Sequence, residues 1–272
     1  SDLKWIIVAI TVFFAAASVL YALMAEEWYR ADTVLAPAND GSVSPLGGQL
    51  GGLAALAGVS VGGGDSIQAI ATLHSRGLAR EFIAAHDLVK VFFADEWDDE
   101  LGTWTGENPA QWPDVRSAVR YFHTNVFSAS QDRETGLVTL AIEWRDPVVA
   151  AMWVEDLVRR VNESLRERAL REAEANVAYL QAELAQTTLV TLQQSIGRLL
   201  ETELQKLMLA RGNEEFAFKT IDAATPPRDR VRPKRALISV AGTMAGGMFA
   251  VFLVFLLHAM RDQRSDELNR AA

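Results

Sequence analysis

Two long uncharged apolar segments, one near each end, constrain this chain more than any other feature of its sequence. Residues 5–24 contain no charged side chain, and residues 236–258 contain a single ionisable one, His258. A bilayer core about 30 Å thick is crossed by roughly 20 helical residues, and core helices of soluble proteins seldom run this long without a polar face. The sequence therefore predicts two transmembrane helices, with both termini on one side of the membrane and the intervening domain on the other.

Composition and motifs exclude several classes of protein. The chain has no cysteine, which removes disulfide scaffolds, thiolate metal sites and cysteine nucleophiles. Its net charge of −9 argues against nucleic-acid binding. The glycine-rich residues 41–66 lack the Lys-Ser/Thr that a phosphate-binding loop needs. His74 and His86 have no evident carboxylate partner and are interpreted as surface or packing residues. We expect no catalytic residue, no metal ligand and no cofactor.

The part that follows the first apolar segment predicts a mixed body of strands and helices. Alternating apolar residues over 138–144, and β-branched and aromatic residues around Thr33, are typical of strands. Residues 65–88 have helical spacing with a break near Ser75 to Gly77. A final strand near residues 216–221 is expected to pair with the strand around Thr33.

A long helical region is predicted over residues 146–212. Asp146 is expected to cap it and Pro147 to occupy its first position. One apolar stripe contains Val154, Leu157, Val158, Val161 and Leu165. Residues 185–189 are a predicted interruption, after which a second helix returns towards the membrane. Asn162 begins a triplet that matches a glycosylation sequon, but a helix interior argues against modification.

An acidic, tryptophan-containing stretch lies inside the body. The acids are Asp95, Glu96, Asp98, Asp99 and Glu100, and the tryptophans are Trp97, Trp104 and Trp112. Tryptophan faces and carboxylates can bind sugars, so glycan contact is one interpretation. The other, which we favour, is a solvated loop whose tryptophans pack onto the domain. The acid spacing matches no calcium loop.

The stretch before the second apolar segment combines prolines with basic residues. Pro226, Pro227 and Pro233 are expected to end the last strand and stiffen the lead into the membrane. Lys234 and its basic neighbours suit the headgroups of anionic lipid. Within the apolar segment, Gly242 and Gly246 form a GxxxG pattern next to Gly247, which lets a neighbouring helix approach closely.

In this order, the segments resemble the polysaccharide co-polymerases, the Wzz-like chain-length determinant proteins of bacterial inner membranes, in a short form without a kinase domain. The likeness covers nearly the whole chain. It is carried by EWYRADTVLAP, LHSRGLAREFIAAHDL, the long helix from Asp146, LMLARGNEEFAFKTIDAATPP and RPKRALI with the glycines after it. The family pattern has a further proline where Arg230 and its neighbours stand here. Only Pro226, Pro227, Pro233, Lys234 and Gly246 are therefore carried over from the family.

The resemblance completes the predicted organisation, an α+β membrane protein with two transmembrane helices bracketing a membrane-proximal body and long extended helices. Its segments are a cytoplasmic stub (1–4), the first span (5–24), a periplasmic α+β body (25–145), the long helical region (146–212), a return strand with the proline-rich basic linker (213–235), the second span (236–258) and a cytoplasmic tail (259–272).

The resemblance also implies a function and partners. A member of this family forms a ring-like homo-oligomer that sets the modal length of a surface polysaccharide, usually O-antigen. The implied partners are further copies of this chain, a membrane polysaccharide polymerase, a lipid-linked glycan and anionic lipid. Two alternatives stay open: an adaptor or coiled-coil component of an export complex, and an enzyme acting on the glycan through the Asp95–Glu100 acids.

Overall fold

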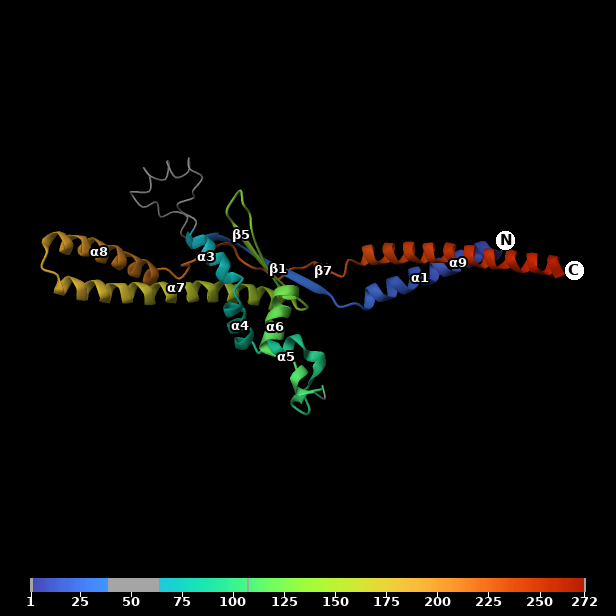
Figure 1. The fold of residues 1–272 in the computed structure, drawn as a ribbon, viewed down its shortest axis with the longest axis horizontal. Helices are drawn as coiled ribbons and strands as arrows, with labels where there is room; N and C mark the ends of the chain where they lie inside the picture. The colour runs from blue at the N-terminus through green and yellow to red at the C-terminus, as the bar shows by residue number, and fades with distance from the viewer. Residues whose placement is uncertain (1, 39–63, 107, 272) are drawn as a thin grey trace. The chain divides into compact units, whose positions relative to one another are not determined.

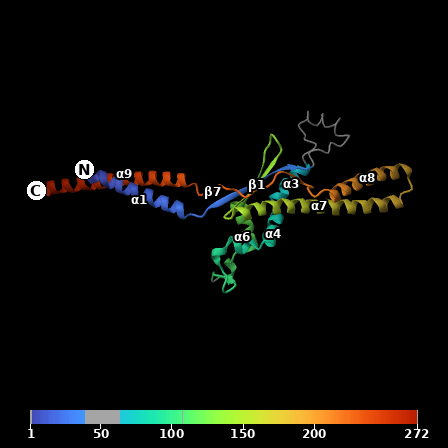
Figure 2. The same ribbon diagram turned by 180° about the vertical axis from the view of Figure 1, so that it is seen from behind.

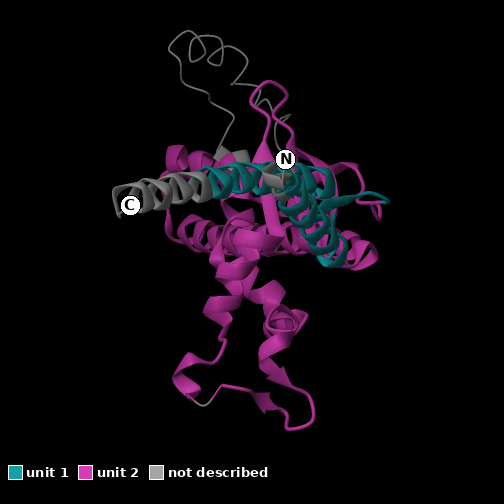
Figure 3. Cartoon of the chain, turned by 90° about the vertical axis from the view of Figure 1, so that its right-hand side faces the viewer, with its two compact units in different colours: residues 1–29, 228–272 teal, residues 30–227 magenta. Residues whose placement is uncertain are grey.

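The computed structural model describes residues 2–38, 64–106 and 108–271, so most of the glycine-rich segment lies outside the described residues. The chain divides into two units (Figure 3). Unit 1 contains residues 1–29 and 228–272, and unit 2 contains residues 30–227. The predicted organisation differs from this division because the strand that leaves the first apolar helix begins in unit 1 and continues into unit 2.

A sheet is built from strands that are far apart in the sequence. Its order is β4 (Phe127–Gln131), β5 (Val138–Trp144), β1 (Trp28–Pro37) and β6 (Phe218–Asp222), and β7 (Arg230–Arg232) also pairs with β1. The β4–β5 and β1–β6 pairs are antiparallel. The expected pairing of the last strand with the strand around Thr33 is confirmed, since Leu35 pairs with Thr220.

Unit 2 also contains several short helices (Figure 1). They are α3 (Gly64–Leu73), α4 (Arg76–Ala85), α5 (Leu88–Phe92), α6 (Val115–Tyr121), the 3-10 turns η1 (Ala94–Glu96) and η2 (Pro109–Gln111), and the π-helical turn η3 (Phe122–Val126). The predicted break near Ser75 is confirmed, because the Ser75 hydroxyl accepts a hydrogen bond from Leu78 N and caps α4. The acidic stretch contains a small hairpin of β2 (Trp97–Asp98) and β3 (Thr103–Trp104), which was not predicted.

The core of unit 2 forms where α4, α6, η3, β5 and the start of α7 meet. Val138, Leu140 and Ile142 alternate along β5 and are fully buried, as their spacing predicts. Phe82 packs its ring against Phe122 at 5.4 Å between centroids. Trp144, Trp153 and Phe92 extend this aromatic cluster.

The long helical region is a hairpin of α7 (Pro147–Gln186) and α8 (Val190–Gly212), which lie side by side in both Figure 1 and Figure 2. An Asp146 carboxylate oxygen accepts hydrogen bonds from Val148 N and Val149 N at 2.8 and 3.2 Å, which confirms the predicted cap. The predicted stripe from Val154 to Leu165 is buried. The interruption falls at residues 187–189, inside the predicted range.

Asn162 is the polar exception on the buried face of α7. Its side-chain oxygen accepts hydrogen bonds from Ala217 N and Phe218 N, each at 2.8 Å, and its amide nitrogen donates to Phe218 O at 3.0 Å. The side chain thus pairs with β6 as a neighbouring strand would, and α7 covers this edge of the sheet. With a relative exposure of 5%, Asn162 is a structural residue and is inaccessible for glycosylation.

Unit 1 contains two apolar helices, α1 (Asp2–Met24) and α9 (Arg235–Ala271), which lie side by side (Figures 1 and 2). Among the described residues, only Arg235–Phe255 is long and apolar enough to cross a membrane, with a mean hydropathy of 2.0. Residues Val8–Met24 form a shorter apolar helix. The second predicted span thus has a matching helix, and the first stays a prediction.

Candidate functional site

The proline-rich basic linker leads into a cluster of charged residues at the start of α9. Pro226 is exposed and Pro227 half-buried at the end of unit 2. In unit 1, the peptide between Arg232 and Pro233 is cis, and the exposed Lys234 immediately precedes α9. The structure therefore places these predicted residues along one short connection, although their contact with lipid stays a prediction.

Four residues form the junction cluster: Glu27, Tyr29, Arg230 and Arg235. The sequence singled out the two arginines as basic residues near Lys234, but it did not single out Glu27 or Tyr29. Glu27 Oε1 accepts hydrogen bonds from Arg230 Nη1 and Arg235 Nη2, each at 2.8 Å, and Glu27 Oε2 accepts one from the Tyr29 hydroxyl at 2.9 Å. The Arg235 Nε also donates to the Ala22 carbonyl at 3.0 Å, near the end of α1. The cluster therefore ties the end of α1 to the start of α9.

The hydrogen bonds of the junction cluster shift two ionisation equilibria. The hydrogen bond from Tyr29, followed by the positive charges of Arg230 and Arg235, lowers the pKa of Glu27 below its usual value. The same hydrogen bond raises the pKa of Tyr29. Two of the basic residues expected at the headgroup level are thus engaged by a carboxylate, whereas Lys234 has no such partner among the described residues.

Two of the three predicted packing glycines lie at a close approach of α1 and α9. A Cβ on Gly242 would lie 2.4 Å from the Cβ of Ser18, and a Cβ on Gly246 would lie 2.4 Å from the Cβ of Phe14. Real side chains do not approach so closely, so these positions need glycine. Gly247 differs, because its added Cβ would meet Thr11 only at an ordinary contact distance of 3.9 Å.

The tryptophans of the acidic stretch are half-buried and have partners within the domain. Trp97 and Trp104 face each other across the small hairpin, with ring centroids 5.0 Å apart and edge to face. The Lys90 ammonium lies 4.9 Å from the Trp97 ring centroid. The Trp112 indole N–H donates to the Gly106 carbonyl at 2.7 Å. This geometry favours the packing interpretation, and glycan contact stays a prediction.

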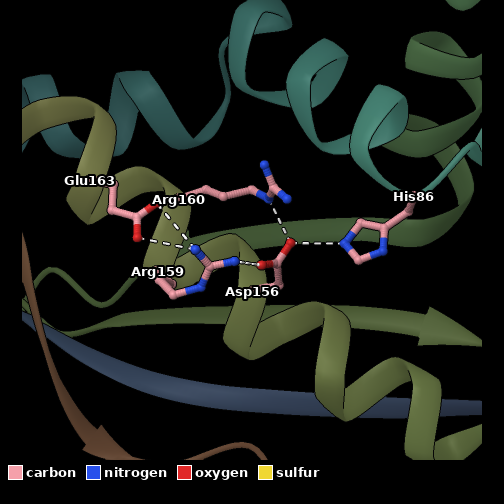
Figure 4. Close-up of polar contacts among 5 residues, drawn as sticks. All are labelled: His86, Asp156, Arg159, Arg160 and Glu163. Carbon is pink, nitrogen blue, oxygen red and sulfur yellow. Dashed lines mark hydrogen bonds and ion pairs between the residues drawn. The ribbon is translucent and has the colours of Figure 1, made fainter.

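A second charged cluster, which we call the Asp156 cluster, joins α4 to α7 and is shown in Figure 4. Asp156 Oδ2 lies 2.8 Å from His86 Nε2 and 2.6 Å from Arg160 Nε, and its Oδ1 accepts from Arg159 Nη2. Arg159 also donates to both carboxylate oxygens of Glu163. His86 therefore has a carboxylate partner, which the sequence did not reveal because the two residues are 70 positions apart.

Competing effects determine the ionisation of the Asp156 carboxyl. Burial would raise its pKa, but hydrogen bonds from Arg160 and His86 and the charge of Arg159 outweigh burial, so the pKa lies below its usual value. The carboxylate therefore stays ionised and holds the two helices together. His74, by contrast, packs its ring on Phe127 at 5.6 Å between centroids, as the packing interpretation expects.

No grouping suited to metal binding is found in the part of the chain that the structure describes: no three His, Asp or Glu side chains there could hold one ion. The charged clusters instead join elements of the fold, α1 with α9 and α4 with α7. The hydrogen bonds and ion pairs of both clusters hold neighbouring helices together.

Comparison with protein families gives two matches. The chain length determinant (Wzz) family matches residues 2–86, and the family described as a G-rich domain on putative tyrosine kinase (GNVR) matches residues 180–259. Together the two segments cover more than half of the chain. The match over residues 2–86 agrees with the predicted resemblance to the Wzz-like polysaccharide co-polymerases. No curated protein sequence matches it.

Comparison with solved structures gives matches that include the following three proteins. A full-length bacterial polysaccharide co-polymerase shares 13% identity, with 95% of each chain covered and a TM-score of 0.43. A fragment of WzzB, a polysaccharide co-polymerase from Salmonella Typhimurium, shares 13% identity over 76% of this chain and 100% of that one, with a TM-score of 0.32. A mutant of the Shigella flexneri lipopolysaccharide O-antigen chain-length regulator WzzBSF shares 12% identity over 75% and 100%, with a TM-score of 0.25. Since these TM-scores are below 0.5, the likeness to this family rests on the two family matches.

Proposed function

We propose that this chain regulates the modal length of a surface polysaccharide, lipopolysaccharide O-antigen, as a co-polymerase of the bacterial inner membrane. The observation that carries the proposal is the pair of family matches, one to the chain length determinant family at residues 2–86 and one at residues 180–259. The sheet and the α7–α8 hairpin, which lie between the two apolar helices in the sequence, support it.

The proposed membrane arrangement has two spans. The helix Arg235–Phe255 supports the second span by its length and composition. The close approach of α1 to Gly242 and Gly246 supports a first span paired with it, since glycine contacts of this kind are common between transmembrane helices. In this proposal both termini are cytoplasmic, and the domain between the spans is periplasmic.

The regulator acts without catalysis in this proposal. Copies of the chain assemble into a ring-like homo-oligomer, which presents a repeated surface to the membrane polymerase and its lipid-linked glycan. Lys234 meets anionic headgroups, and the prolines at 226, 227 and 233 stiffen the connection to α9. The junction cluster and the Asp156 cluster support a role without catalysis, because their charged groups tether helices to one another.

The test is the banding pattern of surface polysaccharide on a gel, from a strain that lacks the protein and from the same strain with it restored. The proposal predicts a modal cluster of chain lengths that disappears on deletion and returns on restoration. An unchanged pattern would refute length control of this glycan. A stable complex with an export partner would then favour the adaptor alternative.

A further inference from the structure

A cavity of about 450 Å³ lies in unit 2 beside the edge of β6 that Asn162 covers. Its walls come from α7, from Thr33 of β1, and from residues that flank or belong to β6. The volume is within the range typical of small-ligand sites. Its lining contains more charged and hydroxyl side chains than apolar ones, which are Val154, Val158 and two alanines.

Arg166 is the unpaired cation of this cavity. Its Nε is shielded from solvent and has no hydrogen-bond partner among the described residues. The other guanidinium in the lining, that of Arg159, is already held by Asp156 and Glu163. A buried N–H group without an acceptor is unfavourable, so the Arg166 Nε–H can donate a hydrogen bond to an incoming oxygen atom.

Acceptors on two different elements also line the cavity. Glu155 projects from α7 and Glu214 from the segment before β6, and neither has an ion pair within the described ranges. Glu215 already accepts a hydrogen bond from Thr220 N at 3.0 Å. Among the described residues, the charged groups of the cavity that have no ion pair therefore include one guanidinium and the two carboxylates of Glu155 and Glu214.

The free donor and acceptor groups of the cavity determine which chemical class of ligand it can bind. An anion would meet the glutamates, and a cation would meet the two arginines. A hydroxyl group both accepts from a guanidinium and donates to a carboxylate, so a neutral ligand with several hydroxyl groups uses all three free side chains. We propose that this cavity binds a neutral sugar unit. The proposal rests on the proposed function for the source of that sugar, the growing polysaccharide.

Binding is measured on the full-length chain in a detergent without a sugar headgroup, by saturation-transfer NMR and calorimetry. The probes are a neutral hexasaccharide (maltohexaose or a mannan hexamer), an oligogalacturonate and a glucosamine oligomer. We expect a neutral hexasaccharide to bind more tightly than either charged probe. Replacing Arg166→Met removes charged hydrogen bonds and should weaken its binding by about tenfold or more.

Arg168→Met is the matched control, because Arg168 is an exposed residue of the same helix and is not part of the cavity lining. It should leave binding unchanged. A second variant, Glu214→Gln, changes an exposed side chain and should weaken binding by about threefold even if Arg166→Met fails to fold. Thermal melting identifies a variant that is unfolded.

The proposal is overturned if neither neutral hexasaccharide binds, if a charged probe binds more tightly, or if folded Arg166→Met and Glu214→Gln proteins bind as well as the wild type. These results concern the purified protein, whereas the gel pattern concerns the cell. If the purified protein binds no sugar but length control in the cell is normal, only the cavity proposal is refuted. If the purified protein binds sugar but the gel pattern does not depend on the protein, only the proposed function is refuted.

Discussion

At the scale of single residues, Asn162 shows how one buried amide can complete a sheet edge. Replacing Asn162→Ala leaves the backbone N–H groups of Ala217 and Phe218 and the Phe218 carbonyl without their partner. Because unpaired buried polar groups are costly, we expect unit 2 to lose about 2–4 kcal/mol of unfolding free energy. Urea unfolding followed by tryptophan fluorescence measures this loss.

Asn176→Ala serves as the control for that change. Asn176 is an exposed residue of α7 that donates to Glu203 of α8 at 3.3 Å. Its replacement should change the unfolding free energy by about 0.5 kcal/mol or less. Equal effects of the two substitutions would contradict the role assigned to Asn162.

His123 gives unit 2 a pH dependence. Burial, followed by the charges of His74 and Arg76, lowers the pKa of His123 in the folded protein. The unfolded chain therefore binds the proton more readily, and stability falls as pH decreases below the unfolded value of about 6.5. We expect a lower melting temperature at pH 5.5 than at pH 7.5.

The variant His123→Phe removes this titrating group and keeps a ring between Phe122 and Phe127. Its melting temperature should change less between the two pH values than that of the wild type. An identical pH dependence in both proteins would show that another group is responsible. The pKa of Asp156 is below its usual value, so this carboxyl does not titrate in that window.

At the scale of elements, the pairing of α1 with α9 depends on two glycines. Replacing Gly246→Leu forces a side chain into Phe14, whereas Gly247→Ala places a methyl group at an ordinary contact distance. We expect the first change to separate the helices and the second to leave them paired. Overpacking of this kind costs about 1–3 kcal/mol.

Spin labels on cysteines introduced at exposed Leu20 and Val240 measure this pairing, because the native chain has no cysteine. The distance distribution should broaden and lengthen in Gly246→Leu and stay narrow in Gly247→Ala. The same narrow distribution in both variants, together with an unchanged oligomer mass, would refute the packing role of Gly246.

The element boundaries that could be predicted are those set by residues at the boundary itself. Asp146 and Ser75 cap helices through their own backbone neighbours, and the interruption after Gln186 follows from residues that disfavour helix. The pairing of β6 with β1 followed from the need to return to the second apolar helix. The β2–β3 hairpin and the π-helical turn after α6 have weaker local signals and were missed.

The candidate sites were harder to predict because their members are distant in sequence. Glu27 and Arg235 are 208 positions apart, and Asn162 and Phe218 are 56 apart. The local sequence around each of these residues does not point to its partner. Only the fold brings them together, whereas the glycine pattern in residues 242–246 could be identified from spacing alone.

At the scale of the whole molecule, membrane topology can be measured by labelling single cysteines. We expect Glu172→Cys, on the exposed surface of α7, to react with an impermeant maleimide once the outer membrane is permeabilised. We expect Asp2→Cys to react only after the inner membrane is disrupted. The reverse pattern would contradict a periplasmic domain, and labelling of both positions would contradict two spans.

The most direct test of length control without catalysis compares surface polysaccharide from strains that carry no protein, the wild type, or a variant in which Asp95, Glu96, Asp99 and Glu100 are alanine. Asp98 is retained because it accepts hydrogen bonds from Glu100 N and Leu101 N in the hairpin turn. The account predicts that the wild type and the variant restore the same modal cluster of chain lengths. A pattern that is identical in all three strains would contradict length control, and failure of a folded variant would favour an enzyme that uses the acids.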